Sequence, residues 1–361
     1  MSGTPGLEAG RGEGRTRQRT PQRDFLVVLV MLAVLAASAT VALRTVSLRL
    51  PPPDIDRTPD LGRLGYTLSL ALFFLPSATI AGWFWHAPRF AIERRAFWIT
   101  VGIGLLFGCL LDVGFGNSFL VFRNPRATLG VFLPGWSPGQ GWLRNIPLEE
   151  FLFYGLGFIA IVLIYVWGNL YWFGAYCADD LRSRAPEIPR LIRPRWSAVA
   201  VVAGLLAAGY AYRYLGPPRH MVGFPGYFTF LVCAGALPSL LFFDAAKPFI
   251  NWRALSFTVF ALLFISLLWE VTLGVPYAWW GYRDAAMLGL FIEAWSHLPI
   301  EAVMVWVAAC YGAIITYETV RLIHYSGRPA WRALMGPARG AGGTRGYAKP
   351  RSTNRSESRT P

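Results

Sequence analysis

Eight runs of about 20 apolar residues constrain this chain more than any other feature of its sequence. A sliding window places them at 25–43, 64–85, 96–113, 147–170, 196–215, 225–243, 255–273 and 299–322. A helix of this length spans a bilayer hydrocarbon core of about 30 Å. Composition agrees, because only 15% of the residues are charged, against about 25% in soluble domains. The sequence predicts an all-α fold, a polytopic membrane helix bundle with eight transmembrane helices.

The first run has an alternative interpretation. Five arginines precede it, and Ala37-Ser38-Ala39 within it matches the small-residue pattern of a signal-peptide cleavage site. The apolar character continues through Leu43. We therefore expect a retained first helix, with a cleaved signal as the alternative.

Charge predicts the orientation of the helices. An even number of helices places both termini on one side, and with cytoplasmic termini the inner segments hold 24 Lys and Arg residues and the outer segments 10. This is the bias of the positive-inside rule, so we expect a cell-membrane protein with both termini in the cytoplasm. The basic ends, 1–23 and 325–361, are expected to be disordered and to contact anionic lipid headgroups rather than nucleic acid.

The second half of the chain repeats the first at an offset of roughly 155 residues. The matched segments are 66–70 with 227–231, 110–113 with 268–271, 129–130 with 288–289, and 145–150 with 297–302. Four helices per copy make the repeats parallel rather than inverted. The predicted organisation is a first repeat at 24–175, a cytoplasmic linker at 176–195 and a second repeat at 196–324.

Acidic residues at the predicted helix ends are the candidate catalytic groups. They are Glu149, Glu150, Glu301, Asp112 and Glu270. Taken alone, each Pro-x-Glu motif is as compatible with a capped helix start as with a functional site. Asp112 and Glu270 instead fall near C-terminal helix ends, where the dipole opposes a negative charge, and acids at membrane depth usually mark a functional cavity. All are expected at the outer boundary, in one cavity shared by the repeats.

Burial of such carboxyl groups raises their pKa and suits acid/base chemistry. Glu149 and Glu150 are adjacent, about 100° apart on a helix, so only one of them can point straight into a shared cavity. The outer loops are also aromatic, which is typical either of an interfacial belt or of a wall that stabilises a carbocation. The candidate substrate-binding residues are Phe122, Trp142, Trp279, Trp280, Tyr282 and His297. His297 is either a member of a proton relay or a polar interfacial residue.

No cofactor motif is present in the sequence. Gly102-x-Gly104 and Gly155-x-Gly157 lie within predicted helices, where small residues more often serve close packing than dinucleotide binding. The four histidines and four cysteines have neither metal-ligand nor disulfide spacing. We therefore expect no cofactor and no metal.

Each copy, over 63–173 and 225–322, resembles the small lycopene cyclase domain of the bacterial heterodimeric and fungal bifunctional carotenoid cyclases. The resemblance rests on the Tyr-rich opening helix, the Leu111-Asp112 and Trp269-Glu270 helix ends, the Gly-containing aromatic loop and the segment 147–153. That segment, Pro-Leu-Glu-Glu-Phe-Leu-Phe, is similar to the Pro-x-Glu-Glu motif of the family. The chain departs from the pattern where Ala302 answers Glu150, where Leu111 replaces a Trp, and where an extra helix precedes each copy.

The resemblance implies a redox-neutral isomerisation of a linear carotene. An acid protonates a terminal double bond, the cation closes a six-membered ring and a base removes a proton. The implied partners are the lipid-soluble carotene, membrane lipids and enzymes of the same carotenoid pathway. Alternatives are another carotenoid end-group enzyme, such as a hydratase, or a transporter or binding protein. A transporter should break its helices near the midplane of the bilayer, whereas the breaks predicted here lie at helix ends.

Overall fold

Seven long apolar helices make up most of the structure, a computed structural model that describes residues 64–86, 92–174 and 181–336 and part of 29–40. They are α3 (Ala71–His86, preceded by α2, Gly65–Ser69), α4 (Arg94–Leu111), α6 (Leu148–Tyr171), α8 (Trp196–Leu215), α9 (Gly226–Ala246), α10 (Trp252–Trp269) and α11 (Ile300–Tyr325). Each is long and apolar enough to cross a membrane and coincides with a predicted run. These lengths and compositions suggest a membrane protein.

The predicted eighth helix, 25–43, lies mostly outside the described residues, although the described positions between 29 and 40 are helical. The basic segment 1–23 and the chain beyond 336 also lie outside them. The predicted disorder from 325 onward is wrong for its first twelve residues, because α11 reaches Tyr325 and the short helix α12 (Ala330–Met335) follows. The carbonyl groups of Ala333 and Leu334 accept hydrogen bonds at 3.0 Å from the backbone of 191–192, which anchors α12.

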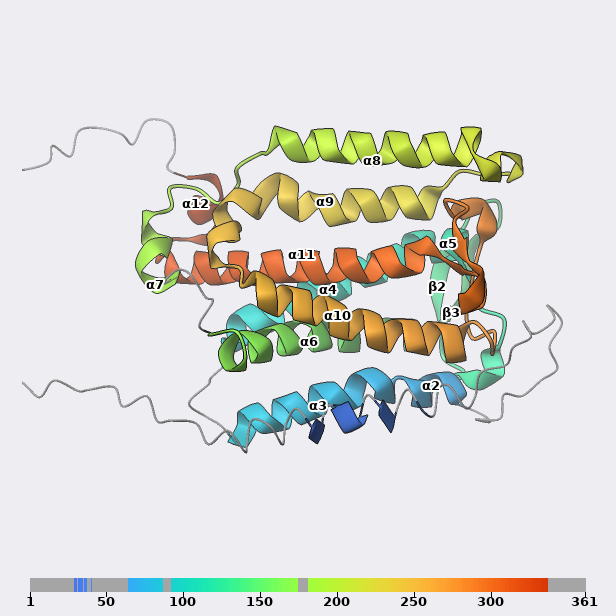
Figure 1. The fold of residues 1–361 in the computed structure, drawn as a ribbon, viewed down its shortest axis with the longest axis horizontal. Coiled ribbons are helices and arrows are strands. Elements are labelled where there is room, and N and C mark those ends of the chain that lie inside the picture. Colours follow the sequence, from blue (N-terminus) through green and yellow to red (C-terminus); the bar gives the residue numbers. More distant parts are fainter. Residues whose placement is uncertain are drawn as a thin grey trace, which may run out of the picture.

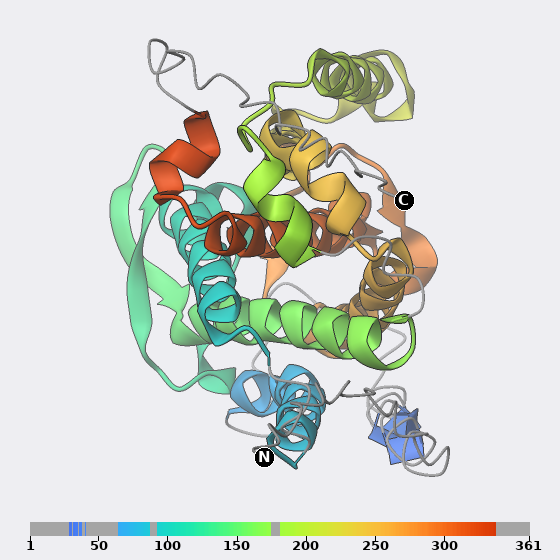
Figure 2. The same cartoon turned by 90° about the vertical axis from the view of Figure 1, so that its left-hand side faces the viewer.

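α11 lies at the centre of the bundle and packs against α4, α6, α9 and α10 (Figures 1 and 2). α3 packs on α6, and α8 packs on α9 at the margin (Figure 1). Apolar side chains on every face fit this arrangement, since a spanning helix meets lipid on one side and protein on the other. The centre of the bundle is therefore formed by helices from both halves of the chain.

Two helices end in a π-helical turn where the sequence places an acid. η1 (Asp112–Gly116) follows α4 and leads into α5 (Asn117–Phe119), and η7 (Glu270–Gly274) follows α10. Asp112 and Glu270 thus lie near the C-terminal ends of α4 and α10, as expected, and the chain continues through a widened turn beyond each acid. Such turns occur frequently at functional sites.

Short strands join the loops at the end of the bundle where α6 and α11 begin. The antiparallel pairs are β1 (Leu120–Val121) with β4 (Gly281–Tyr282), β2 (Phe132–Ser137) with β3 (Gly141–Pro147), and β5 (Phe291–Ile292) with β6 (Leu298–Pro299). The β1–β4 pair links the loops of the two halves. The remaining short elements are η2 (Pro125–Ala127), α7 (Leu181–Arg184), η4 (Ala185–Glu187), η5 (Pro217–His220), η6 (Lys247–Phe249), η8 (Asp284–Ala286) and η9 (Glu293–Trp295).

A buried ionic network lies at the opposite end of the bundle. Arg321 donates to Glu318 Oε2 at 2.7 Å and to Glu93 Oε1 at 3.0 Å. Glu318, which is fully buried, also accepts a hydrogen bond from the Tyr165 hydroxyl at 3.0 Å. This network joins α11 to α6 and to the start of α4.

Arg321→Met is expected to lower the free energy of unfolding by about 3–5 kcal/mol, because it leaves the buried Glu318 carboxylate without its counter-charge. Glu93→Gln should have a much smaller effect, since Arg321 still pairs with Glu318. Unfolding of the two purified variants in the same detergent micelle measures the difference. Equal stability of Arg321→Met and the wild type would contradict a stabilising role for the network.

Candidate functional site

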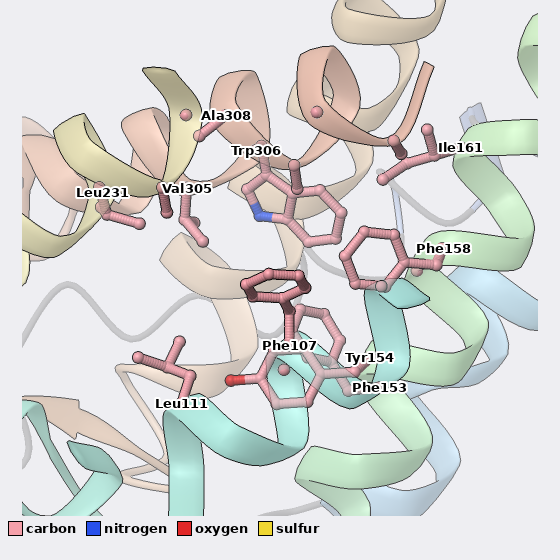
Figure 3. A pocket seen from close by; sticks show the side chains of 18 of the residues that line it. Phe107, Leu111, Phe153, Tyr154, Phe158, Ile161, Leu231, Val305, Trp306 and Ala308 are labelled. Carbon is pink, nitrogen blue, oxygen red and sulfur yellow. The ribbon is translucent and has the colours of Figure 1, made fainter. Parts of the chain in front are cut away.

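An apolar cavity of about 420 Å³ lies inside the bundle. Its walls come mainly from α4, α6, α9 and α11, and Figure 3 shows Phe107 of α4, Leu231 of α9 and Trp306 of α11 among the side chains that line it. Both halves of the chain line this single space. Most of the lining side chains are aliphatic or aromatic, and the two carboxyl groups among them belong to Glu150 and Glu270.

Glu150 is in the first turn of α6, where Pro147 precedes the helix and the helix dipole favours a negative charge. Its Oε1 accepts a hydrogen bond of 2.5 Å from the hydroxyl of Tyr66. Its Oε2 has no hydrogen-bond partner among the described residues and is not sealed off by them. Glu150 thus presents one oxygen that is held by Tyr66 and one that is available to a molecule in the cavity.

Glu270 is the first residue of η7 and is held differently. Its Oε1 accepts from the Ser266 hydroxyl at 3.2 Å, and its Oε2 accepts from the Tyr282 hydroxyl at 2.5 Å. Tyr282 lies outside the spanning helices, and burial together with the nearby Glu270 carboxylate raises the pKa of its phenol. Tyr282 therefore stays a donor. Ser266 and Tyr282 thus hold the two oxygens of Glu270.

Asp112 occupies the corresponding first position of η1 and is fully buried. Its Oδ1 accepts a hydrogen bond of 3.0 Å from the hydroxyl of Tyr154, which lines the cavity. Asp112 itself does not line it, and its Oδ2 is buried without a partner. Asp112 thus contacts the cavity through Tyr154.

Glu149 and Glu301 do not face the cavity, so the prediction that they share it with Glu150 is wrong. Glu149 Oε1 accepts from the Leu129 N–H and the Thr67 hydroxyl, both at 2.6 Å. Glu301 Oε1 accepts from the Leu288 N–H at 2.5 Å. Adjacent helical positions diverge by about 100°, so Glu149 points toward a loop when Glu150 points inward.

A buried cation lies close to Glu301. Arg213 of α8 is fully buried and donates to the Val222 carbonyl at 3.1 Å. Its guanidinium interacts electrostatically with Glu301. Arg213 is thus buried near the start of α11 and does not line the cavity.

Aromatic rings surround the acidic end of the cavity. Tyr66 lies 5.1 Å from Trp280 and 5.8 Å from Trp279, measured between ring centroids. Trp269 lies 4.3 Å from Trp280, and its Nε1 donates to Ser69 Oγ at 2.8 Å. Trp269, Trp280 and Trp306 all line the cavity. Their faces supply the negative electrostatic potential that attracts a cation.

Two of the six predicted substrate-binding residues, Trp280 and Tyr282, line the cavity. Trp279 is buried behind Tyr66 and does not reach it, and Phe122 is half-buried outside it. The β1–β4 pairing, Leu120 with Tyr282 and Val121 with Gly281, brings the loops that carry these aromatic residues together.

Trp142 and His297 lie away from the cavity. Trp142 is exposed on β3 and packs against Trp136 of β2, an arrangement that fits an interfacial belt. The His297 ring is 2.9 Å from the Glu293 carboxylate and stacks on Phe291. His297 therefore belongs to the surface of the loop.

Tyr154, Tyr227 and Trp306 also line the cavity, although the sequence motifs do not single them out. Tyr154 follows Glu150 by four positions, and Trp306 follows Ala302 by four positions, so each lies on the same helix face as the motif residue. Extending that face along each helix would have found both side chains. Tyr227 is the counterpart of Tyr66 in the repeat, and this match is the sequence signal that points to it.

Among the residues that the structure describes, no group of three or more His, Cys, Asp or Glu side chains could hold a metal ion. No protein-family model matches the chain, and no curated protein and no solved structure matches it either. The fold and the site together suggest a membrane protein of seven or more spans, in which carboxyl–tyrosine pairs border an apolar cavity.

Proposed function

We propose that the protein is a carotenoid cyclase that closes a terminal ring of a linear carotene, with lycopene as the implied substrate. The observation that carries this proposal is the pair of unlike carboxyl groups at one end of an apolar, aromatic cavity. Glu150 has an oxygen available to a ligand, and Glu270 has both oxygens occupied by donors. Environments that differ in this way separate the acid from the base.

In the proposed reaction the Glu150 carboxyl gives its proton to the terminal double bond, whose electron pair forms the new C–H bond. A second double bond of the same carotene attacks the resulting carbocation and closes a six-membered ring. Glu270 then accepts a proton from a neighbouring ring carbon, and the electrons of that C–H bond form the ring double bond. The product is an isomer of the substrate, and a proton returned from Glu270 restores Glu150.

The aromatic wall supports the cationic intermediates. Trp269, Trp280 and Trp306 line the cavity with Tyr66 and Glu270, so a carbocation there would meet ring faces and one carboxylate. An apolar surround also limits the access of water, which would otherwise capture the cation. This favours isomerisation over hydration.

We further propose that the chain contains two parallel copies of one four-helix unit. Several matched features support the duplication: η1 and η7 each begin with an acid, and Glu149 and Glu301 each bind a loop N–H, of Leu129 and Leu288. Both acidic loops lie at the same end of the bundle, as parallel copies require (Figure 1). Glu150 faces the cavity from the first copy, and Ala302 replaces it in the second.

The proposed location is the cell membrane with both termini in the cytoplasm, supported by the Lys/Arg distribution. In this orientation the acidic end of the cavity is near the outer boundary. The proposed partners are the carotene, membrane lipids and enzymes of the same carotenoid pathway.

Expression of the chain in a host that accumulates lycopene tests the proposal. We expect a cyclic pigment of unchanged mass to appear on chromatography. A pigment heavier by one water would identify a hydratase instead. Unchanged lycopene, with the protein present in the membrane, would contradict an end-group enzyme and favour a transporter or binding protein.

A further inference from the structure

The cavity is a long slot that runs along the bundle away from the acids. Its lining extends from Leu111 to Thr100 on α4 and from Val305 to Thr316 on α11. At 1.5 Å per residue, each of these walls is about 16 Å long. On α9 the lining extends from Tyr227 to Phe242, about 22 Å by the same rise. The slot thus covers half or more of a hydrocarbon core of about 30 Å.

One side of the slot is open between α4 and α9. Each of these helices packs closely on α11, whereas α4 and α9 have few or no close backbone contacts with one another in the described part of the chain. Ile103 and Phe107 of α4 and Leu237 of α9 line the slot, yet 37%, 50% and 42% of their surfaces are exposed. These positions are in helices long and apolar enough to cross a membrane, and a bilayer places lipid tails against exposed apolar surface of such helices. The slot therefore opens sideways into the hydrocarbon.

The acidic end of the same gap is closed by aromatic rings. The Phe119 centroid lies 5.1 Å from Tyr227 and 5.8 Å from Phe115, and Phe230 of α9 contacts both phenylalanines. These contacts join η1 and α5, which follow α4, to α9. A molecule that reaches the acids must come along the slot from the lipid side.

Small residues leave the slot open along its α11 wall. Four positions of α11 that line it carry no side chain beyond Cβ: Ala308, Ala309, Gly312 and Ala313. Gly104 and Gly108 of α4 lie against the rings of Phe158 and Tyr154, so a Cβ atom at either glycine would overlap a ring. The space above α11 is therefore long and narrow.

The slot suits an uncharged occupant. No lysine, arginine or histidine occurs among the described residues that line it, whereas two carboxyl groups do. A phospholipid or a fatty acid would bring an anionic group without a cation to pair it. A linear hydrocarbon with a reactive end fits the long, narrow shape of the slot and brings no charge that the slot would have to pair.

We propose that the gap between α4 and α9 is a lateral entrance through which a linear, uncharged polyene slides from the bilayer. One end of the polyene reaches Glu150 and Glu270, the next 16 Å or so of the polyene lie over α11, and the rest of the polyene stays in lipid. The identity of the polyene rests on the proposed function, but the binding geometry does not need the reaction. Because one chain end fills the slot, the two ends of a carotene react one at a time, so a one-ring product precedes a two-ring product.

Binding of lycopene to the purified protein in lipid nanodiscs tests the entrance. Lycopene is achiral, so circular dichroism in its visible band reports only the bound molecule. Ala309→Phe and Ala234→Phe fill the slot from α11 and α9, and each is expected to weaken binding by about tenfold or more, because the added ring occupies space that the polyene needs. Val307→Phe and Cys233→Phe are matched controls, since these exposed neighbours do not line the slot.

Wild-type binding by both filled variants would overturn the proposal, and so would equal loss in the two controls. Thermal unfolding of each variant separates a filled slot from a misfolded protein. A cysteine-free chain carrying Leu237→Cys gives a second measurement, in which lycopene should block most labelling by a lipid-soluble maleimide. Labelling of Val201→Cys on α8 should not change. If lycopene binds but no ring forms, the proposed function is rejected and the entrance is retained. If rings form equally well in the filled variants and in the wild type, the entrance is rejected and the proposed function is retained.

Discussion

Glu150→Gln is expected to reduce ring formation by about 100-fold or more, within the usual contribution of a general acid. Glutamine keeps the size of the side chain and can still accept the hydrogen bond from Tyr66, but it has no acidic proton for a double bond. Pigment chromatography in a host that accumulates lycopene measures the effect, with immunoblotting of membranes to compare the amount of protein.

Glu149→Gln is the matched control for this experiment. The Glu149 carboxylate binds the Leu129 N–H and the Thr67 hydroxyl, and a glutamine oxygen can accept both hydrogen bonds. We expect a modest loss of stability with most of the product retained. Wild-type ring formation by Glu150→Gln, together with loss of ring formation in Glu149→Gln, would reverse the assignment and make Glu149 the general acid.

Glu270→Gln is expected to have the second large effect, about 100-fold as the loss of a general base. The amide neither takes a proton nor stabilises a nearby positive charge. Tyr282→Phe should have a smaller effect, about tenfold as the loss of one hydrogen bond to a charged group. Ser266 still donates to the carboxylate in that variant.

Turnover of the same lycopene preparation by purified variants measures both effects. Equal activity of Glu270→Gln and the wild type would remove Glu270 from the chemistry. A Tyr282→Phe variant less active than Glu270→Gln would instead place the essential proton on the phenol.

Most of the helices could be predicted from the sequence because lipid imposes a simple requirement. A spanning segment must be apolar and must satisfy its own backbone hydrogen bonds, so hydropathy alone locates it. Spans such as Trp196–Leu215 and Leu148–Tyr171 therefore lie where the runs predict them. The chain beyond Tyr325 was less predictable, because α12 is held by backbone hydrogen bonds to a distant loop rather than by a long apolar run.

The site was predicted in type more than in detail. The repeat and the motif identified Glu150, Asp112 and Glu270, but a sequence does not reveal which of two adjacent glutamates faces inward. That choice depends on the exact phase of α6 and on the Leu129 N–H that holds Glu149. The tyrosine partners come from distant elements: Tyr66 reaches Glu150 across 84 positions. Contacts of this range follow from helix packing and not from local pattern.

Because of the π-helical turn at Glu270, side-chain substitutions alone would not reveal everything that positions this carboxylate. The Glu270 carbonyl accepts from the N–H of Val275, five positions later, at 3.0 Å. Adjacent side chains in an ordinary helix diverge by about 100°, yet Trp269 and Glu270 both line the cavity. The location of this carboxylate is therefore set by backbone length as well as by side-chain identity. Loss of one residue within 271–274 would restore an ordinary turn and move the charge, while every side chain of the site remained present.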